Sequence, residues 1–105
     1  MPIPIDNGAA IAAVIDGRAL LFCRVGDVVF ALANACAHDG VAMDGASLNG
    51  FTLVCPRHSG CYYDIRHGAR IGAEGTIECF SVRVDAGGRV LVGFDLPFVA
   101  RLPAL

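Results

Sequence analysis

The stretch NACAHDGVAMDGASLNGFTLVCPRHSGCYYD, residues 34–64, holds three of the five cysteines and two of the three histidines of the chain. Four of these side chains form two close pairs, Cys36-Ala37-His38 and Cys55-Pro56-Arg57-His58, with sixteen residues between the pairs. Each pair lies in a predicted loop beside a predicted strand, so the two pairs can face one another across a hairpin. Two short loops therefore offer two thiolates and two imidazoles, which are donors for a metal centre.

Three kinds of metal centre use such donors. Structural zinc sites usually take two cysteines from one loop and two histidines from another, whereas each loop here offers one of each. A blue copper site needs one cysteine, two histidines and a weak axial ligand, and copper(I) prefers sites richer in sulfur. A [2Fe-2S] cluster of the Rieske type, with two cysteines on one iron and two histidines on the other, uses all four donors. The cluster is the better fit, and zinc stays as an alternative.

Strand and turn signals surround this stretch on both sides. Asp16-Gly17 and Gly26-Asp27 are predicted turns of a three-stranded meander, and residues 85–88 (DAGG) are a predicted hairpin loop. No segment shows a sustained helical period, and the thirteen glycines suit a turn-rich sheet protein. These features predict an all-β fold. The expected strands are Ile11–Ile15, Ala19–Arg24, Val28–Leu32, Phe51–Val54, Cys61–Asp64, Thr76–Val84 and Arg89–Phe94.

Several side chains have a simple structural interpretation. Cys23 and Cys79 are expected to be small, partly buried strand residues, and His67 is expected in a turn. Tyr62 and Tyr63 should point to opposite faces of a strand, and one hydroxyl could instead bond a ligand sulfur. Alternation in strand 76–84 places one set of residues on the core side: Glu78, Phe80, Val82 and Val84, with Ile77, Cys79, Ser81 and Arg83 on the other side. The apolar tail 96–105 fits either packing on the barrel or contact with a partner.

Composition excludes several classes of function. A chain of 105 residues with 55% hydrophobic and 17% charged residues is expected to form one folded domain. The formal charge of -2 and the absence of basic runs exclude a nucleic-acid binder. No apolar run is long enough to cross a bilayer and no signal peptide is evident, so we expect a cytoplasmic protein without membrane contact. In a reducing compartment, five cysteines indicate metal ligands or buried residues rather than disulfides.

The motif and its surroundings resemble the Rieske ferredoxin family. The family pattern is Cys-x-His, about sixteen residues, then Cys-x-x-His, and both halves are present. Glycines at 40, 45 and 50 also match, and Met43 stands where the family usually has leucine. The similarity continues past the motif through Asp64 and Gly68 to the final hairpin, so it covers nearly the whole chain.

The resemblance implies a small Rieske-type antiparallel β-sandwich or barrel. Residues 1–105 would form a single domain, in which two loops within about residues 34–68 build the cluster-binding subdomain. One [2Fe-2S] cluster per chain is implied, with Cys36 and Cys55 on one iron and His38 and His58 on the other. Because imidazoles are neutral ligands, such a cluster accepts an electron more readily than one held by thiolates alone.

Two departures from the family pattern concern the cluster environment. High-potential Rieske proteins carry an additional cysteine in each loop, and these two form a disulfide, whereas this chain has Val41 and Arg57 at those places. Because it lacks this disulfide, the chain resembles the low-potential branch of the family, which comprises the ferredoxins of ring-hydroxylating dioxygenases and related oxygenases. That branch commonly reaches an aspartate five residues after the second histidine, whereas Asp64 lies six residues after His58.

The resemblance implies an electron carrier rather than an enzyme. The expected role is to take one electron from a flavin-containing ferredoxin reductase and pass it, as a monomer, to a terminal oxygenase. Val41, Ala42 and Met43 are expected either to form the contact patch or to pack over the cluster. Two alternatives stay open: a small Rieske-like subunit or regulatory module of a larger redox enzyme such as nitrite reductase, and a structural zinc domain.

Overall fold

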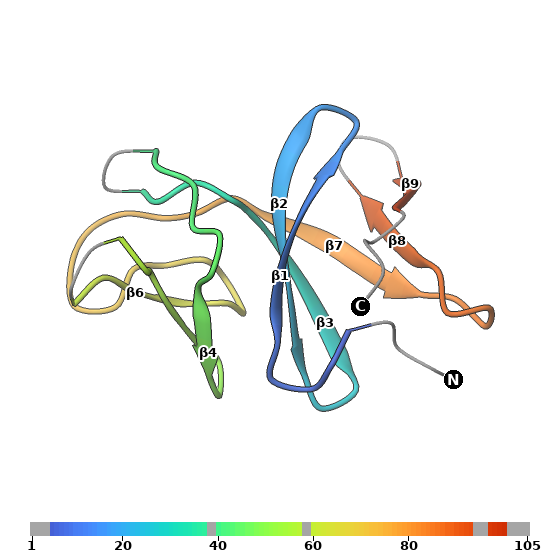
Figure 1. Ribbon diagram of the computed structural model, residues 1–105, viewed down its shortest axis with the longest axis horizontal. Coiled ribbons are helices and arrows are strands. Elements are labelled where there is room, and N and C mark those ends of the chain that lie inside the picture. Colours follow the sequence, from blue (N-terminus) through green and yellow to red (C-terminus); the bar gives the residue numbers. More distant parts are fainter. Residues whose placement is uncertain (1–4, 38–39, 58–59, 94–96, 101–105) are drawn as a thin grey trace.

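The chain forms two antiparallel β-sheets that lie side by side in a computed structural model (Figure 1). The structure describes residues 5–37, 40–57, 60–93 and 97–100, and the side chains of these ranges up to residue 93. Every regular element within the described ranges is a β-strand. The predicted all-β fold class is therefore confirmed.

The larger sheet has six strands in the order β1-β2-β3-β7-β8-β9. Its first three strands form the predicted meander, and the turn between β1 and β2 has positive φ at both Asp16 (51°) and Gly17 (76°). Such two-residue turns match the twist of the strands they join, which is why Asp-Gly predicted the hairpin correctly. The bounds are β1 Ala10–Ile15, β2 Arg18–Val25, β3 Val28–Ala33, β7 Cys79–Val84, β8 Val90–Gly93 and β9 Pro97–Ala100.

The smaller sheet contains β4 (Ser47–Asn49), β5 (Thr52–Val54) and β6 (Tyr62–Asp64) in that order. In its register Leu48 pairs with Leu53, and Leu53 pairs with Tyr63. Paired residues project to the same face, so these three side chains form the inner face of the sheet. One cysteine-bearing loop connects β3 to β4, and the other connects β5 to β6. Both loops lie at one end of the molecule.

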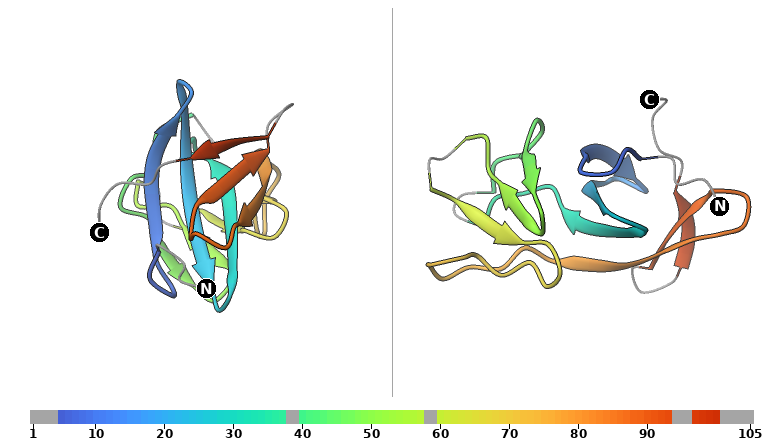
Figure 2. Two further views of the ribbon diagram at one scale, coloured as in Figure 1. Left: turned by 90° about the vertical axis from the view of Figure 1, so that its right-hand side faces the viewer. Right: turned by 90° about the horizontal axis from the view of Figure 1, so that it is seen from below.

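Two cores lie on opposite faces of the larger sheet, because successive residues of β2 point to opposite sides. Leu21 and Cys23 pack against the smaller sheet. Leu20 and Phe22 pack on the other side with Val90 and Val92 of β8. Residues of β2 and β8, which are not neighbours in the strand order, share one core because the larger sheet curls, and Figure 2 shows this curvature. The curled sheet provides the predicted barrel-like part of the fold.

The start of β7 differs from the prediction. The strand begins at Cys79 rather than Thr76, and Thr76 makes only an isolated bridge to Ala69. Alternation therefore holds from Phe80 to Val84 but not before: Ile77 is buried, Glu78 is exposed and Cys79 is exposed rather than partly buried. The reason is that the backbone between Thr76 and Cys79 is not extended in a ladder, so a period of two does not apply there.

The tail is the second difference from the expected strands. Residues 97–100 form β9, which pairs antiparallel with β8 at the edge of the larger sheet. This segment therefore packs on the larger sheet, which is one of the two outcomes that the sequence left open. Among the described residues, no helix is long and apolar enough to span a membrane.

Candidate metal centre

Both cysteine-bearing loops are closed by the backbone of their first cysteine. Cys36 donates its N–H to the carbonyl of Val41 at 2.8 Å, and Cys55 donates to the carbonyl of Cys61 at 3.0 Å. A glycine with positive φ precedes each acceptor residue, Gly40 at 77° and Gly60 at 76°. Glycine adopts this left-handed conformation without a steric penalty, so it can return the chain to the cysteine. The two loops therefore share one design although their lengths and sequences differ.

A buried asparagine fixes the first loop to the rest of the fold. Asn34 accepts a hydrogen bond from the N–H of Met43 at 2.6 Å and donates through Nδ2 to Asp44 Oδ1, also at 2.6 Å. Its side chain thus joins the start of the segment that contains Cys36 to the end of that segment at Met43 and Asp44. Because its amide is buried with both kinds of polar group bonded, Asn34 can hold the loop without a desolvation penalty.

The folded chain brings three cysteine sulfurs together at this end of the molecule. The Sγ atoms of Cys36, Cys55 and Cys61 all lie within 4.8 Å of one another, and all three residues are buried. Cys36 Sγ and Cys61 Sγ are 3.7 Å apart. We call this group the three-cysteine site. Cys36 and Cys55 were predicted as ligands, whereas Cys61 was expected to pack beside them or to contact the ligands, and these roles stay predictions.

Tyr63 lies against the three-cysteine site through its hydroxyl group. The hydroxyl oxygen accepts the N–H of Ala37 at 2.9 Å and the thiol of Cys61 at 3.4 Å, and it lies 3.1 Å from Cys36 Sγ. With both lone pairs of the oxygen used, the hydroxyl hydrogen is free to donate to Cys36. The predicted division of the two tyrosines is confirmed, since Tyr63 is fully buried and Tyr62 is exposed.

Burial keeps the groups around the site protonated. It raises the pKa of the Tyr63 hydroxyl, and the contacts with Cys36 and Cys61 raise it further. Burial is also the largest cause of the raised pKa of the Cys61 thiol. Cys23, which lies in the same core but outside the three-cysteine site, has its pKa raised by burial to about 12. Cys23 is therefore a thiol at neutral pH, consistent with a packing role.

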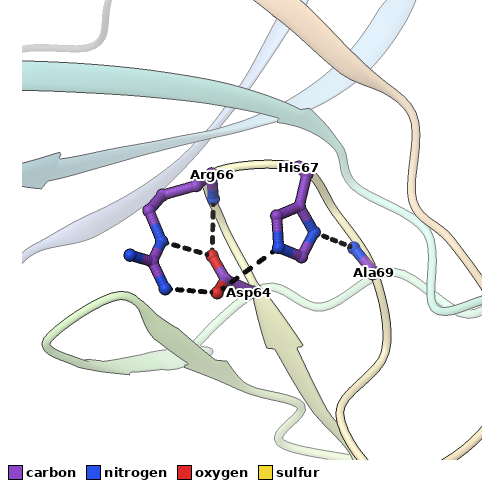
Figure 3. A network of polar contacts seen from close by, with 4 residues as sticks. All are labelled: Asp64, Arg66, His67 and Ala69. Carbon is purple, nitrogen blue, oxygen red and sulfur yellow. Dashed lines mark hydrogen bonds and ion pairs between the residues drawn. The ribbon is translucent and has the colours of Figure 1, made fainter.

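A compact turn follows β6, and Figure 3 shows the polar contacts that hold it together. Asp64 accepts the backbone N–H of Arg66 at 2.9 Å and its guanidinium at 2.6 and 3.0 Å, and His67 Nε2 lies 3.5 Å from the same carboxylate. The hydrogen bonds from Arg66 hold the pKa of Asp64 at about 2. His67 also accepts the N–H of Ala69 through Nδ1. Its prediction as a turn residue is confirmed.

The remaining predicted site residues fall into two groups. His38 and His58 lie outside the residues that the structure describes, so their role as ligands stays a prediction. Of the three apolar residues of the first loop, Met43 is fully buried, whereas Val41 and Ala42 are exposed. Met43 therefore packs in the core, and only the other two can contact a partner.

The donor set of the site fits an iron–sulfur cluster. Thiolates hold the iron in such clusters, and hydrogen bonds to their sulfurs are a principal means of setting the potential. The three-cysteine site offers buried sulfurs, and Tyr63 offers a hydroxyl hydrogen beside one of them. An all-β fold with two loops that enclose buried sulfurs at one end defines a small iron–sulfur protein of the electron-transfer class.

Comparison with known proteins identifies the family. The model of the Rieske [2Fe-2S] domain matches residues 4–82, and the chain belongs to this family. It accordingly binds a [2Fe-2S] cluster and acts in electron transfer. Sequence comparison with curated proteins found no match.

Solved structures agree with this assignment. The ferredoxin of carbazole 1,9a-dioxygenase from Nocardioides aromaticivorans IC177 is 28% identical, with a TM-score of 0.75 over 84% of this chain and 86% of that chain. A chain in the complex of reduced oxygenase and oxidized ferredoxin in carbazole 1,9a-dioxygenase is 25% identical, with a TM-score of 0.74 over 84% and 82%. A protein assigned as an NADPH nitrite reductase small subunit shares the fold at 15% identity, with a TM-score of 0.72 over 86% and 90%.

Removal of the Tyr63 hydroxyl is expected to lower the reduction potential. In Tyr63→Phe the sulfur of Cys36 loses the hydroxyl group that lies 3.1 Å from it, so the more negative reduced state loses stabilisation. One such bond of about 1.4 kcal/mol corresponds to about 60 mV for a one-electron couple. Protein-film voltammetry measures the shift. Tyr62→Phe is the matched control, because its hydroxyl lies on the exposed face, and an equal shift in both variants would contradict the assignment.

Proposed function

We propose that this chain is a ferredoxin that carries one electron from a flavin-containing ferredoxin reductase to a terminal oxygenase. The single observation that carries the proposal is the three-cysteine site, buried at one end of a fold like that of a dioxygenase ferredoxin. Nothing in this role requires a substrate pocket or a catalytic residue in the chain itself. Residues 1–105 act as one domain, with the cluster-binding part at about residues 34–68.

The proposed ligands are Cys36 and Cys55 for one iron and His38 and His58 for the other. Burial of both cysteines in loops closed by their own backbone supports their half of the set. The bound cluster supplies a reversible one-electron couple. The chain's own residues hold the loops in place, exclude water from the sulfurs and offer hydrogen bonds to them. The two imidazoles would give the electron a short path to a partner docked near Val41 and Ala42.

Reconstitution tests this role directly. The purified holo-protein replaces the native ferredoxin in a mixture of NADH and the reductase and terminal oxygenase of a carbazole 1,9a-dioxygenase, and hydroxylated product is measured. Product is expected to rise with the concentration of this chain and to be absent with its Cys55→Ala variant. Product formation that is the same with and without the chain would contradict the proposal. Size-exclusion chromatography is expected to give a monomer, whereas a permanent complex with a larger redox enzyme would favour the subunit alternative.

The proposed low-potential branch gives a separate prediction. Without a disulfide between the loops, as Val41 and Arg57 require, the potential is expected at the low end for Rieske centres, about -150 mV. Voltammetry of the holo-protein measures this value without any partner. A clearly positive potential would place the chain with the high-potential proteins, even if reconstitution succeeds.

A further inference from the structure

Arg70 lies on the inner face of the cluster-binding region, although it follows the exposed turn after β6. It is paired with Tyr63 in an isolated antiparallel bridge, and its N–H donates to the carbonyl of Gly75 at 2.9 Å. Residues opposite one another in an antiparallel pair project to the same face, with Cβ atoms about 5 Å apart. Because Tyr63 points at the three-cysteine site, Arg70 projects to the same side.

Its stem lies close to the first cysteine loop. A Cβ atom at Gly75 would lie 3.8 Å from Cδ of Arg70 and 3.2 Å from Cβ of Ala37. Ala37 directly follows Cys36 and bonds the Tyr63 hydroxyl. The absence of a side chain at Gly75 therefore leaves room beside both the loop and the arginine stem.

The guanidinium of Arg70 has a buried donor that the described residues do not satisfy. Its Nε is inaccessible to solvent and has no hydrogen-bond partner within the described part of the chain. Buried N–H groups are almost always bonded in folded proteins, so an exception requires an explanation. Arg66 on the same connection is the opposite case, since it is exposed and makes two side-chain hydrogen bonds to Asp64.

Arg70 brings its positive charge to the side of the site on which Tyr63 and the first cysteine loop lie. An arginine is charged at every pH at which the fold exists, so this positive charge is a fixed feature of the site.

We propose that Arg70 sets the reduction potential of the bound cluster by placing a fixed positive charge, and an otherwise unpaired buried N–H donor, beside the three-cysteine site. Reduction adds one negative charge to the cluster, and a nearby cation stabilises the reduced state more than the oxidised state. Arg70 therefore makes the cluster easier to reduce. The inference rests on the cysteines of this site holding the cluster, but it does not depend on which proteins donate or accept the electron.

Three variants of the holo-protein test the inference by voltammetry. Arg70→Gln removes the charge, Arg70→Lys keeps the charge without the Nε–H group, and Arg66→Gln removes an exposed charge as a matched control. Arg70→Gln is expected to weaken electron uptake about tenfold, the order expected for a unit charge several ångströms away at the effective dielectric of a protein. For a one-electron couple a tenfold change is about 59 mV. Arg70→Lys should fall between Arg70→Gln and the parent, and Arg66→Gln should match the parent.

Iron content and the electron paramagnetic resonance spectrum of each reduced variant show whether the cluster itself is intact. Equal potentials of Arg70→Gln and Arg66→Gln, with both clusters intact, would overturn the inference. If Arg70→Gln does not take up a cluster, the comparison of Arg70→Lys with Arg66→Gln decides: a loaded Arg70→Lys with a lowered potential supports the inference. A parent-like potential in Arg70→Lys would overturn the role of the Nε–H donor, and failure of both Arg70 variants to load would mean that the residue is structural. Because no partner protein is used, these outcomes are independent of the reconstitution result.

Discussion

Cys55→Ala is expected to lose both irons, whereas Cys61→Ala is expected to keep two irons and the spectrum of the reduced cluster. Both substitutions remove one buried sulfur from the same three-cysteine site, so their effects on packing are similar. They differ in the proposed role, because Cys55 is a ligand and Cys61 lies beside the ligands. Loss of Cys55 leaves its iron with only one of two protein donors, and we expect that the cluster is not retained.

Iron and acid-labile sulfide per chain, together with electron paramagnetic resonance after reduction, measure this difference. Circular dichroism of both variants checks that the strands persist. Cys23→Ala is a further control, because Cys23 is equally buried in the same core but lies outside the three-cysteine site. An iron-free Cys61→Ala with native circular dichroism would identify Cys61 as a ligand and require a different donor set. Two irons in Cys55→Ala would exclude the proposed ligand set altogether.

The parts of the fold that the sequence predicts correctly have strong local signals. Asp16-Gly17 predicts the β1–β2 hairpin because few residues other than glycine adopt positive φ so easily. The two cysteine-histidine pairs were predicted to face one another across a hairpin, and the sulfurs of Cys36 and Cys55 lie within 4.8 Å of each other. Strand alternation predicts that Tyr62 and Tyr63 point to opposite faces, and the structure shows that Tyr63 is the buried one.

The errors occur where local signals are weak or tertiary contacts decide. β4 was not predicted, because three residues with Ser47 and Asn49 at the ends carry little strand propensity. Ile77 was predicted to face away from the core, whereas it is buried. The error arose because alternation was assumed from Thr76, and the strand begins only at Cys79. Arg70 was not recognised as a site residue at all. Its position depends on a bridge to Tyr63 across the intervening turn, and no spacing in the sequence reveals that pairing.

Gly68→Ala is expected to be the most destabilising of the substitutions considered, although Gly68 is neither a ligand nor in contact with one in the described structure. Its φ of 76° lies in the left-handed region, which costs a residue with a side chain about 1–2 kcal/mol. A Cβ atom here would also overlap the carbonyl oxygen of Ile77 and lie 2.9 Å from Cys79 Sγ. The carbonyl belongs to the backbone, so it cannot move aside as the end of a flexible side chain would.

The clash matters because of what Gly68 connects. The N–H of Gly68 donates to the backbone carbonyl of Asp64 at 2.7 Å, and its own carbonyl accepts the N–H of Ile77 at 2.8 Å. Ile77 is buried in the core that contains the three-cysteine site. Movement of Ile77 would therefore open this core. We expect a loss of about 3 kcal/mol or more in the free energy of unfolding, with weaker cluster retention.

Gly72→Ala separates the two contributions. Gly72 has nearly the same φ, 79°, but an added Cβ atom would meet no atom within 4 Å. This variant should lose only the conformational part, about 1–2 kcal/mol. In thermal unfolding followed by circular dichroism, Gly68→Ala should therefore melt well below Gly72→Ala, by about 4 °C or more for each kcal/mol of difference. Equal melting temperatures would show that the backbone near Ile77 yields to the added carbon at little cost, and that the close approach at Gly68 does not hold the cluster-binding core together.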